Sequence, residues 1–345
     1  MSAPAPQPAS QVSGGSALPE PSADAASTPF VPAPFSLLAL IKLARPHQWV
    51  KSVFVLLGPL YGLRDIPKER WQDVIVQGLI AAGVFALASS ASYIYNDLRD
   101  VNADRHHPRK RNRPIASGAV SPGLAVAMMA TLVLGGGALS LLLHSAYRPG
   151  TLLLVGLYMF NVLAYSALLK HRVIADVLSL SLGFVLRVIG GCVAVGIMPS
   201  TWLLNCTLFL AMFLAFAKRL GERRTAEAAG YDAVAARSVQ GKYTDELLRM
   251  SVVVTAVATL ITYAFYVQSR ESAAVFATSL IPAGINWLWF TILPATYALL
   301  RSMVLIERGA YDDPTEMFLK DNPLRLAGIA FIAITIAVAL VFGHK

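Results

Sequence analysis

The sequence predicts an all-α membrane protein, a polytopic bundle of about nine transmembrane helices. Of its 345 residues, 56% are hydrophobic and only 14% are charged, a balance too apolar for an ordinary soluble globule. Long apolar runs recur, each close to the roughly 20 residues that cross about 30 Å of hydrocarbon as a helix. Backbone polar groups cannot stay unpaired in lipid, so these runs are expected to be helices rather than open strands.

Each apolar run is expected to form one helix, and no second domain interrupts the series. The nine runs are 47–63, 72–95, 122–145, 151–169, 174–196, 200–217, 250–268, 285–304 and 325–343. Residues 36–345 are therefore predicted to be one transmembrane domain. Residues 1–35 are rich in Pro, Ala and Ser. They are predicted to be a disordered tail, since they lack the basic start and apolar core of a signal peptide.

The basic residues gather at the predicted helix ends. With a cytoplasmic N-terminus, 22 of the 29 Lys and Arg residues fall on the cytoplasmic side. The positive-inside rule thus predicts a multi-pass protein of the cell (inner) membrane whose N-terminus and active site face the cytoplasm. Topology accounts for most of the net charge of +9, and no nucleic-acid partner is expected. The sequence is compatible with a homo-oligomer without specifying one. Both cysteines, Cys192 and Cys206, are predicted to be packing residues.

The most polar stretch is YNDLRDVNADRHHPRKRNRP, residues 95–114. If the second helix continues into it, four oxygen-bearing side chains fall within an arc of about 100°. Clustered carboxylates repel one another unless they share a cation, and Mg²⁺ is the hard cation that also takes ligands from substrate phosphates. The predicted Mg²⁺ ligands are Asn96, Asp97, Asp100 and Asp104.

Two other interpretations of this stretch are disfavoured. In the first, the aspartates of a solvated helix end pair with Arg99 and Arg105, but these arginines lie on other faces of the helix. In the second, His106 and His107 bind zinc, but adjacent histidines point apart on a helix and no cysteine accompanies them.

A cationic flank follows the carboxylates. It contains Arg109, Lys110, Arg111 and Arg113. Cations beside a Mg²⁺ cluster suit a polyanionic substrate, and Lys110 and Arg113 are candidate substrate-binding residues. Simple anchoring at the cytoplasmic face remains open for the flank as a whole.

These residues also carry a family resemblance. The pattern Asn96-Asp97-x-x-Asp100-x-x-x-Asp104, followed by RPIASG at 113–118, resembles the UbiA superfamily of intramembrane prenyltransferases over about residues 36–343. Three further stretches resemble its branch that transfers phosphoribose to decaprenyl phosphate. They are RPHQWVKS at 45–52, YSALLKHRVIADV at 165–177 and AKRLGE at 217–222.

One departure from the superfamily pattern bears on the donor. Members that cleave prenyl diphosphates usually carry a second motif, DxxxD, where this chain reads DVLSL, with Asp176 but Leu180. The nearby loop offers Lys218, Arg219 and Glu222 rather than another aspartate pair. The resemblance implies that Tyr165, Lys170 and Asp176 line the donor pocket.

The predicted reaction is the Mg²⁺-dependent transfer of 5-phosphoribose from phosphoribosyl diphosphate to a polyprenyl phosphate such as decaprenyl phosphate, with release of diphosphate. This donor needs a metal at one end and cations at the other. The acceptor phosphate is largely dianionic at neutral pH, so no strong general base is required. The enzyme would be a pentosyltransferase that makes lipid-linked arabinose precursors for the cell envelope, as the resemblance implies.

The predicted site residues fall into two groups. The catalytic candidates are Asp97, Asp100, Tyr165 and Asp176. The substrate-binding candidates are Arg45, Lys51, Lys110, Arg113, Lys170, Arg187, Lys218 and Glu222.

Several of these residues keep a structural alternative. Arg45 and Lys51 would serve equally as interfacial snorkelling residues, and Lys170 as part of a basic loop. Lys218 and Glu222 have the spacing of a helical ion pair. Asp176 and Arg187 have the spacing of a structural salt link through their neighbours.

The alternative functions are an aromatic prenyltransferase of quinone or haem biosynthesis and, from another class, a membrane transporter. Leu180 argues against the first, and the position of the aspartates at a helix end argues against the second. The loop at 218–249 is predicted to cap the site, with Tyr243 near its end, and to keep water from the reactive sugar. Phe184, Trp287 and Trp289 either border an isoprenoid groove or pack in ordinary ways.

Overall fold

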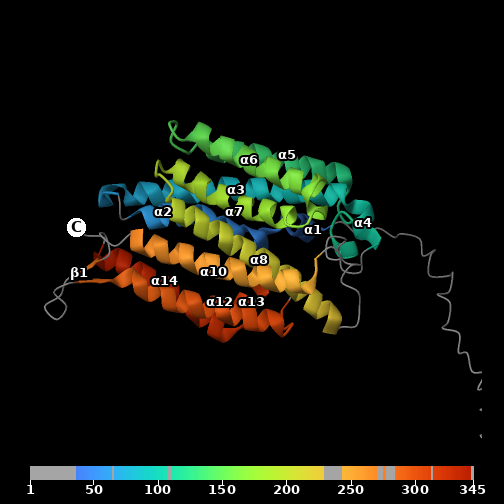
Figure 1. Ribbon diagram of the computed structural model, residues 1–345. Coiled ribbons are helices and arrows are strands. Elements are labelled where there is room, and N and C mark those ends of the chain that lie inside the picture. Colours follow the sequence, from blue (N-terminus) through green and yellow to red (C-terminus); the bar gives the residue numbers. More distant parts are fainter. Residues whose placement is uncertain are drawn as a thin grey trace, which may run out of the picture.

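The computed structural model confirms the all-α membrane bundle (Figure 1). It describes residues 36–63, 66–106, 110–228, 243–269, 275–276, 284–311 and 314–342. The predicted tail at 1–35 and most of the predicted cap, at 229–242, lie outside the described residues, as do His107 and Arg109.

The long helices are α3 (Trp71–Arg99), α5 (Pro122–Ser140), α6 (Arg148–Ala167), α7 (Ala175–Ala194), α8 (Thr201–Ala228), α10 (Asp245–Ser269), α12 (Ile292–Glu307) and α14 (Asn322–Phe342). The short elements are α1 (Leu37–Ala44), η2 (Pro46–Ser52), α2 (Val53–Gly62), η4 (Lys68–Arg70), α4 (Val101–His106), η5 (Lys110–Asn112), η6 (Leu169–His171), β1 (Val275–Phe276), β2 (Ile285–Asn286), η8 (Trp287–Thr291) and α13 (Pro314–Lys320).

Seven helices of the described chain are long and apolar enough to cross a membrane, so the predicted count of nine is not confirmed. The first predicted run is divided between η2 and the 10-residue α2. The ninth corresponds to the 21-residue α14, of which the described apolar part is Asn322–Val338. The predicted loop at 218–249 begins as a helix, because α8 continues to Ala228.

Helix α7 lies at the centre of the bundle. It packs against α2, α3, α6 and α8, while α5 lies against α3 and α10 against α8. On the far side α12 and α14 pack together (Figure 1). Because α7 touches both halves, a polar group on it can meet partners from the first half or the second.

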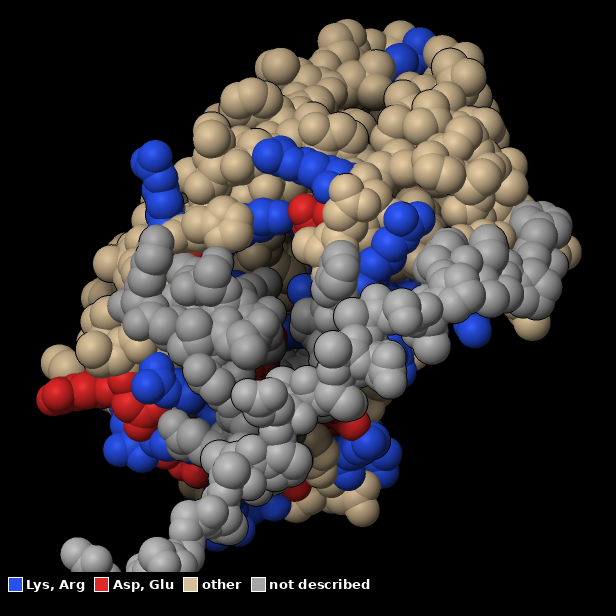
Figure 2. Space-filling model, turned by 90° about the vertical axis from the view of Figure 1, so that its right-hand side faces the viewer, with Lys and Arg blue, Asp and Glu red and all other residues tan. Residues whose placement is uncertain are grey.

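Basic side chains mark one end of the bundle. The short α4 and the C-terminal end of α8 lie at this end, and the β1–β2 hairpin lies at the other (Figure 1). Figure 2 looks onto the α4 end and shows Lys and Arg side chains gathered there, with fewer Asp and Glu between them. The orientation prediction rests on this concentration of cations.

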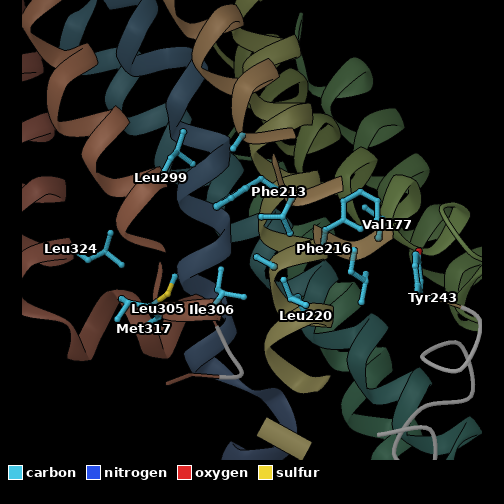
Figure 3. Close-up of a cluster of buried hydrophobic side chains, with 14 residues drawn as sticks. Val177, Phe213, Phe216, Leu220, Tyr243, Leu299, Leu305, Ile306, Met317 and Leu324 are labelled. Carbon is cyan, nitrogen blue, oxygen red and sulfur yellow. The ribbon is translucent and has the colours of Figure 1, made fainter. Parts of the chain in front are cut away.

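The second half of the bundle has its own hydrophobic core. Val177 of α7 packs there with Phe213, Phe216 and Leu220 of α8, and residues of α10, α12, α13 and α14 complete it. Figure 3 shows Tyr243 at the edge of this cluster. The core thus holds the segment preceding α10 against the start of α7.

Close contact between α2 and α7 depends on glycine. A Cβ at Gly191 would overlap the carbonyl oxygen of Val55, and a Cβ at Gly58 would overlap the sulfur of Cys192. Small residues let helix backbones approach closely inside a membrane, where packing rather than the hydrophobic effect holds helices together. Cys192 is buried and neither cysteine forms a disulfide, which agrees with their predicted packing role.

We expect Gly191→Ala to destabilise the protein, because the added methyl group forces α2 away from α7. Overpacking of this kind costs about 1–3 kcal/mol. Thermal unfolding in detergent, followed by circular dichroism, measures the loss. The matched control is Gly156→Ala in α6, where a Cβ meets nothing within 4 Å. Equal melting temperatures for the two variants would contradict the proposed close contact.

Candidate active site

Three aspartates emerge near the junction of α3 and α4. Helix α3 ends at Arg99, and Asp100 follows as its C-cap with φ −93° and ψ 7°. The N–H of Asp100 donates to the carbonyl of Asn96 at 2.9 Å, and the N–H of Asp104 donates to that of Asp100 at 2.8 Å. The chain therefore keeps helical spacing through the junction, as the one-sided pattern of the aspartates requires.

Arg45 reaches Asp97 from the N-terminal segment. Its Nη2 lies 2.6 Å from Oδ1 and 2.7 Å from Oδ2 of Asp97. Arg45 caps α1 in the left-handed conformation, with φ 52° and ψ 55°. The following Pro46 disfavours a right-handed helical conformation at this position, so the chain turns here. The Arg45 guanidinium also lies 5.3 Å from the centre of the Tyr93 ring.

Two further cations complete the cluster. Arg113, just after η5, donates from Nη1 to Asp97 Oδ1 at 3.0 Å and to Asp104 Oδ2 at 2.7 Å. Lys170 of η6 donates to both oxygens of Asp100, at 3.0 and 3.1 Å. Three carboxylates are thus matched by three cations. We refer to Arg45, Asp97, Asp100, Asp104, Arg113 and Lys170 as the carboxylate layer.

The partners of the carboxylates differ from those of the disfavoured alternative. They are Arg45, Arg113 and Lys170, which lie outside α3 and α4, rather than Arg99 and Arg105. Arg105 donates to the carbonyl of Ala116 at 3.4 Å. Asp97 and Asp104 are buried, and a buried carboxylate is retained only when it is paired and hydrogen-bonded.

The donor set of this layer suits Mg²⁺. In the described chain, no three His, Cys, Asp or Glu side chains are arranged to hold a metal ion on their own. Mg²⁺ does not need such a cage, because it usually binds through one or two carboxylates and completes its shell with water and substrate phosphates. Asp97 and Asp100 offer hard oxygen ligands of this kind.

Asp176 lies in a separate and fully enclosed network at the start of α7. The Tyr243 hydroxyl donates to its Oδ1 at 2.6 Å, and Arg219 Nε donates to its Oδ2 at 3.3 Å. Asp176 and Arg219 are both buried. Tyr243 and Arg219 are themselves buried, unlike the partly exposed cations of the carboxylate layer, so they cannot readily move aside to let Asp176 bind a ligand. We call Asp176, Arg219 and Tyr243 the α7 latch.

The latch also holds a strained residue. Ile174 has φ 67° and ψ −47°, a conformation that is an outlier for a β-branched side chain. Its N–H donates to the Tyr243 hydroxyl at 2.8 Å. Burial raises the pKa of the Tyr243 phenol well above its usual range, so the phenol keeps the proton that it donates to Asp176.

Arg187 occupies a third position, farther along α7. Its guanidinium donates to Ser89 Oγ at 3.1 Å and to Tyr158 Oη at 2.7 Å. A salt link between Asp176 and Arg187 through their neighbours is absent in the described structure, because Asp176 pairs with Arg219 instead. That structural alternative is wrong.

Comparison with known proteins identifies the family. The model of the UbiA prenyltransferase family matches residues 53–271. A decaprenyl-phosphate phosphoribosyltransferase from Mycolicibacterium smegmatis is 36% identical over 303 residues, which cover 88% of this chain and 92% of that protein. A protein of the same name from Mycobacterium tuberculosis is 35% identical and covers 90% of this chain and 97% of its own length. The chain belongs to the UbiA prenyltransferase family.

Solved structures agree on the fold of this family member. A UbiA homologue from Archaeoglobus fulgidus, bound to DMAPP and Mg²⁺, superposes with a TM-score of 0.58 at 17% identity and covers 88% of this chain and 99% of its own. The apo structure of a UbiA homologue from Aeropyrum pernix K1 gives a TM-score of 0.56 at 18% identity, over 86% and 97% of the two chains. The protein is thus a membrane-embedded transferase with the UbiA fold.

The remaining predicted site residues of this UbiA-family chain lie outside the carboxylate layer as described. Glu222 lies 3.9 Å from the Arg219 guanidinium. Tyr165 lies in the last turn of α6, Lys110 begins η5 and Lys218 lies in α8, and all three are half-buried. Phe184 packs against Phe54 with 4.7 Å between ring centres, and Trp289 is exposed.

Sequence reasoning missed several partners. Ser89 and Tyr158 resemble ordinary helix residues in the sequence, and no periodicity marks them as partners of an arginine. Arg219 and Tyr243 were recognised only as members of a loop. One signal was available for the partner of Asp176. Arg219 lies just after the apolar run 200–217, and an arginine in such a helix is expected to pair with a carboxylate.

We expect Tyr243→Phe to lower the stability of the protein by about 1–3 kcal/mol, because it leaves the Ile174 N–H and one Asp176 oxygen buried without a partner. The thermal midpoint in detergent measures this loss. Tyr297→Phe is the matched control, since Tyr297 is 49% exposed on α12. If Tyr243→Phe unfolds at the same temperature as Tyr297→Phe, the latch does not hold α7 and α10 together.

Proposed function

We propose that the protein transfers 5-phosphoribose from phosphoribosyl diphosphate to a polyprenyl phosphate, with decaprenyl phosphate as the representative acceptor. The observation that carries the proposal is the carboxylate layer, in which Asp97, Asp100 and Asp104 form ion pairs with two arginines and a lysine. The similarity to decaprenyl-phosphate phosphoribosyltransferases over most of the chain supports it.

The burial of Asp176 favours phosphoribosyl diphosphate over a prenyl diphosphate as the donor. A second Asp-rich motif would add carboxylates on α7, but Asp176 is sealed by Tyr243 and Arg219 and Leu180 stands where a second aspartate would be. A single carboxylate layer with abundant cations suits a donor that carries phosphate groups at both ends of a sugar.

The reaction needs little from the protein beyond binding and charge stabilisation. The bond between C1 of the ribose and the diphosphate breaks, and the electron pair leaves with the diphosphate. A phosphate oxygen of the acceptor forms the new bond to C1. Bound through Asp97 and Asp100, Mg²⁺ would supply Lewis-acid stabilisation of the leaving charge. Arg45, Arg113 and Lys170 are positioned to bind phosphate oxygens and hold the donor in place.

The location of the reaction follows from the charge distribution. We propose that the N-terminus and the carboxylate layer face the cytoplasm, because cations gather at that end of the bundle. The product would then be a lipid-linked phosphoribose, which we propose serves as an arabinose precursor for cell-envelope polysaccharides.

A transfer assay tests the reaction. Purified protein in nanodiscs is given Mg²⁺, ribose-labelled phosphoribosyl diphosphate and decaprenyl phosphate, and the organic phase is counted. We expect label in the organic phase, its loss with EDTA and its recovery with excess Mg²⁺. Aqueous label throughout, together with isoprenylation of 4-hydroxybenzoate from a prenyl diphosphate, would establish the aromatic prenyltransferase instead.

We expect Asp100→Asn to lower kcat/KM for transfer roughly 100-fold or more, because several kcal/mol of charge stabilisation are lost with one metal ligand. Asp100 is the appropriate aspartate because it is more exposed than Asp97 and its loss disturbs the fold less. Asp73→Asn is the matched control, since Asp73 lies in the first turn of α3 and pairs with exposed His144 at 2.7 Å. Similar activity in the two variants would exclude Asp100 from the site.

A further inference from the structure

A second layer of polar groups lies deeper along α3 than the carboxylates. Ser89 and Ser90 precede Asp97 by eight and seven residues, which places them about 10–12 Å along the helix axis at 1.5 Å per residue. Ser90 donates to the carbonyl of Ala44 at 2.7 Å and accepts from the Trp49 indole at 2.9 Å. The segment containing η2 is therefore held at this depth.

Arg187 occupies the same layer and is almost fully enclosed, with 4% of its surface exposed. Besides Ser89 and Tyr158, it donates to the carbonyl of Gly183 at 3.4 Å. Its guanidinium lies 4.4 Å from the centre of the Tyr158 ring and 5.4 Å from that of Phe184. Its buried Nε has no hydrogen-bond partner in the described structure.

The charge balance of the two layers differs. The carboxylate layer contains three acids and three bases and is close to neutral. Arg187 contacts only hydroxyl groups, a carbonyl and aromatic rings, with no carboxylate among its partners in the part of the chain that the structure describes. The inner layer is therefore positive.

An enclosed positive charge inside a membrane bundle is a candidate site for an anion. An arginine at membrane depth faces a protein interior or a cavity, pairs with other charged groups or with backbone carbonyls, and commonly marks a functional site, because a lone charge in this environment is costly. Neutral hydrogen bonds and ring contacts offset only part of that cost. The Nε–H of this guanidinium has no partner in the described structure, and a charged N–H of this kind binds phosphate oxygens well.

We propose that Arg187, oriented by Ser89 and Tyr158, forms the subsite for the phosphate of the lipid acceptor. This assignment rests on the proposed function. In it, the donor binds at the carboxylate layer and the phosphate of the acceptor binds at the inner layer. The water-soluble donor reaches the carboxylate layer from the end of the bundle, whereas a polyprenyl phosphate enters from the hydrocarbon and meets the inner layer first. The reacting sugar carbon then lies between them.

The test uses Arg187→Met, which keeps the length and apolar stem of the side chain and removes its charge. In nanodiscs we expect the KM for decaprenyl phosphate to rise about tenfold or more, while the KM for phosphoribosyl diphosphate changes less than twofold. Arg148→Met is the matched control, because Arg148 donates to the carbonyls of Leu141 and Leu143, just after α5. It should leave both KM values unchanged.

A binding measurement separates this subsite from the reaction itself. Decaprenyl phosphate, but not uncharged decaprenol, should raise the thermal midpoint of the wild-type protein, and Arg187→Met should lose this increase. This readout remains valid if no phosphoribosyl transfer is found, so failure of the subsite and failure of the proposed function are distinguishable. If Arg187→Met does not fold, Arg187→Lys keeps the charge without the planar guanidinium and should weaken the same increase.

Two outcomes would overturn the assignment. If Arg187→Met lowers the thermal midpoint but leaves both KM values and the lipid-phosphate increase intact, Arg187 only braces Tyr158 and Phe184. If the KM for phosphoribosyl diphosphate rises selectively, the inner layer binds a phosphate of the donor instead.

Discussion

The ion pairs of Asp97 determine how the first half of the bundle is assembled. A carboxylate enclosed at the end of an apolar helix is stable only when opposite charge and hydrogen bonds replace the water that it lost. Arg45 supplies them from the turn after α1, and Arg113 supplies them from the segment after η5. Both segments are short, and the ion pairs add to the apolar contacts and the Ser90 hydrogen bonds that also hold these segments against α3. The electrostatic requirement of the site is therefore also a requirement of the fold.

In the second half of the bundle, the buried carboxylate of Asp176 is likewise stabilised by hydrogen bonds and an opposite charge, but its partners in the α7 latch are buried as well. Asp176 is satisfied by Tyr243, which precedes α10, and by Arg219 of α8. This arrangement joins three helices at one point beside the hydrophobic core shown in Figure 3. A carboxylate used in this way stabilises the bundle and is poorly suited to bind metal. The absence of an aspartate at Leu180 is consistent with this structural use, since a lone enclosed carboxylate does not make a second metal site.

Much of the fold and part of the site could be predicted from the sequence, for identifiable physical reasons. Apolar length predicts membrane helices because the bilayer sets one thickness, and helical spacing places Asp97, Asp100 and Asp104 together because α3 and α4 are nearly continuous. The helix count was harder to predict, since the first apolar run, 47–63, begins as the 3-10 helix η2 and becomes an α-helix only at Val53. Long-range partners could not be predicted, because Lys170 lies 70 residues from Asp100 and nothing local in the sequence encodes that distance.

Exposure distinguishes the ion pairs that can exchange partners from those that are permanent. The side chains of Arg45, Arg113 and Lys170 are 21%, 26% and 24% exposed, whereas that of Arg219 is 1% exposed. A partly exposed cation can move from a carboxylate to an incoming phosphate without passing through an unsolvated state, so its cost of desolvation is small at each step. Arg219 has no such route. A donor that carries its own metal and phosphates would therefore redistribute charge within the carboxylate layer while the α7 latch keeps the helices in place.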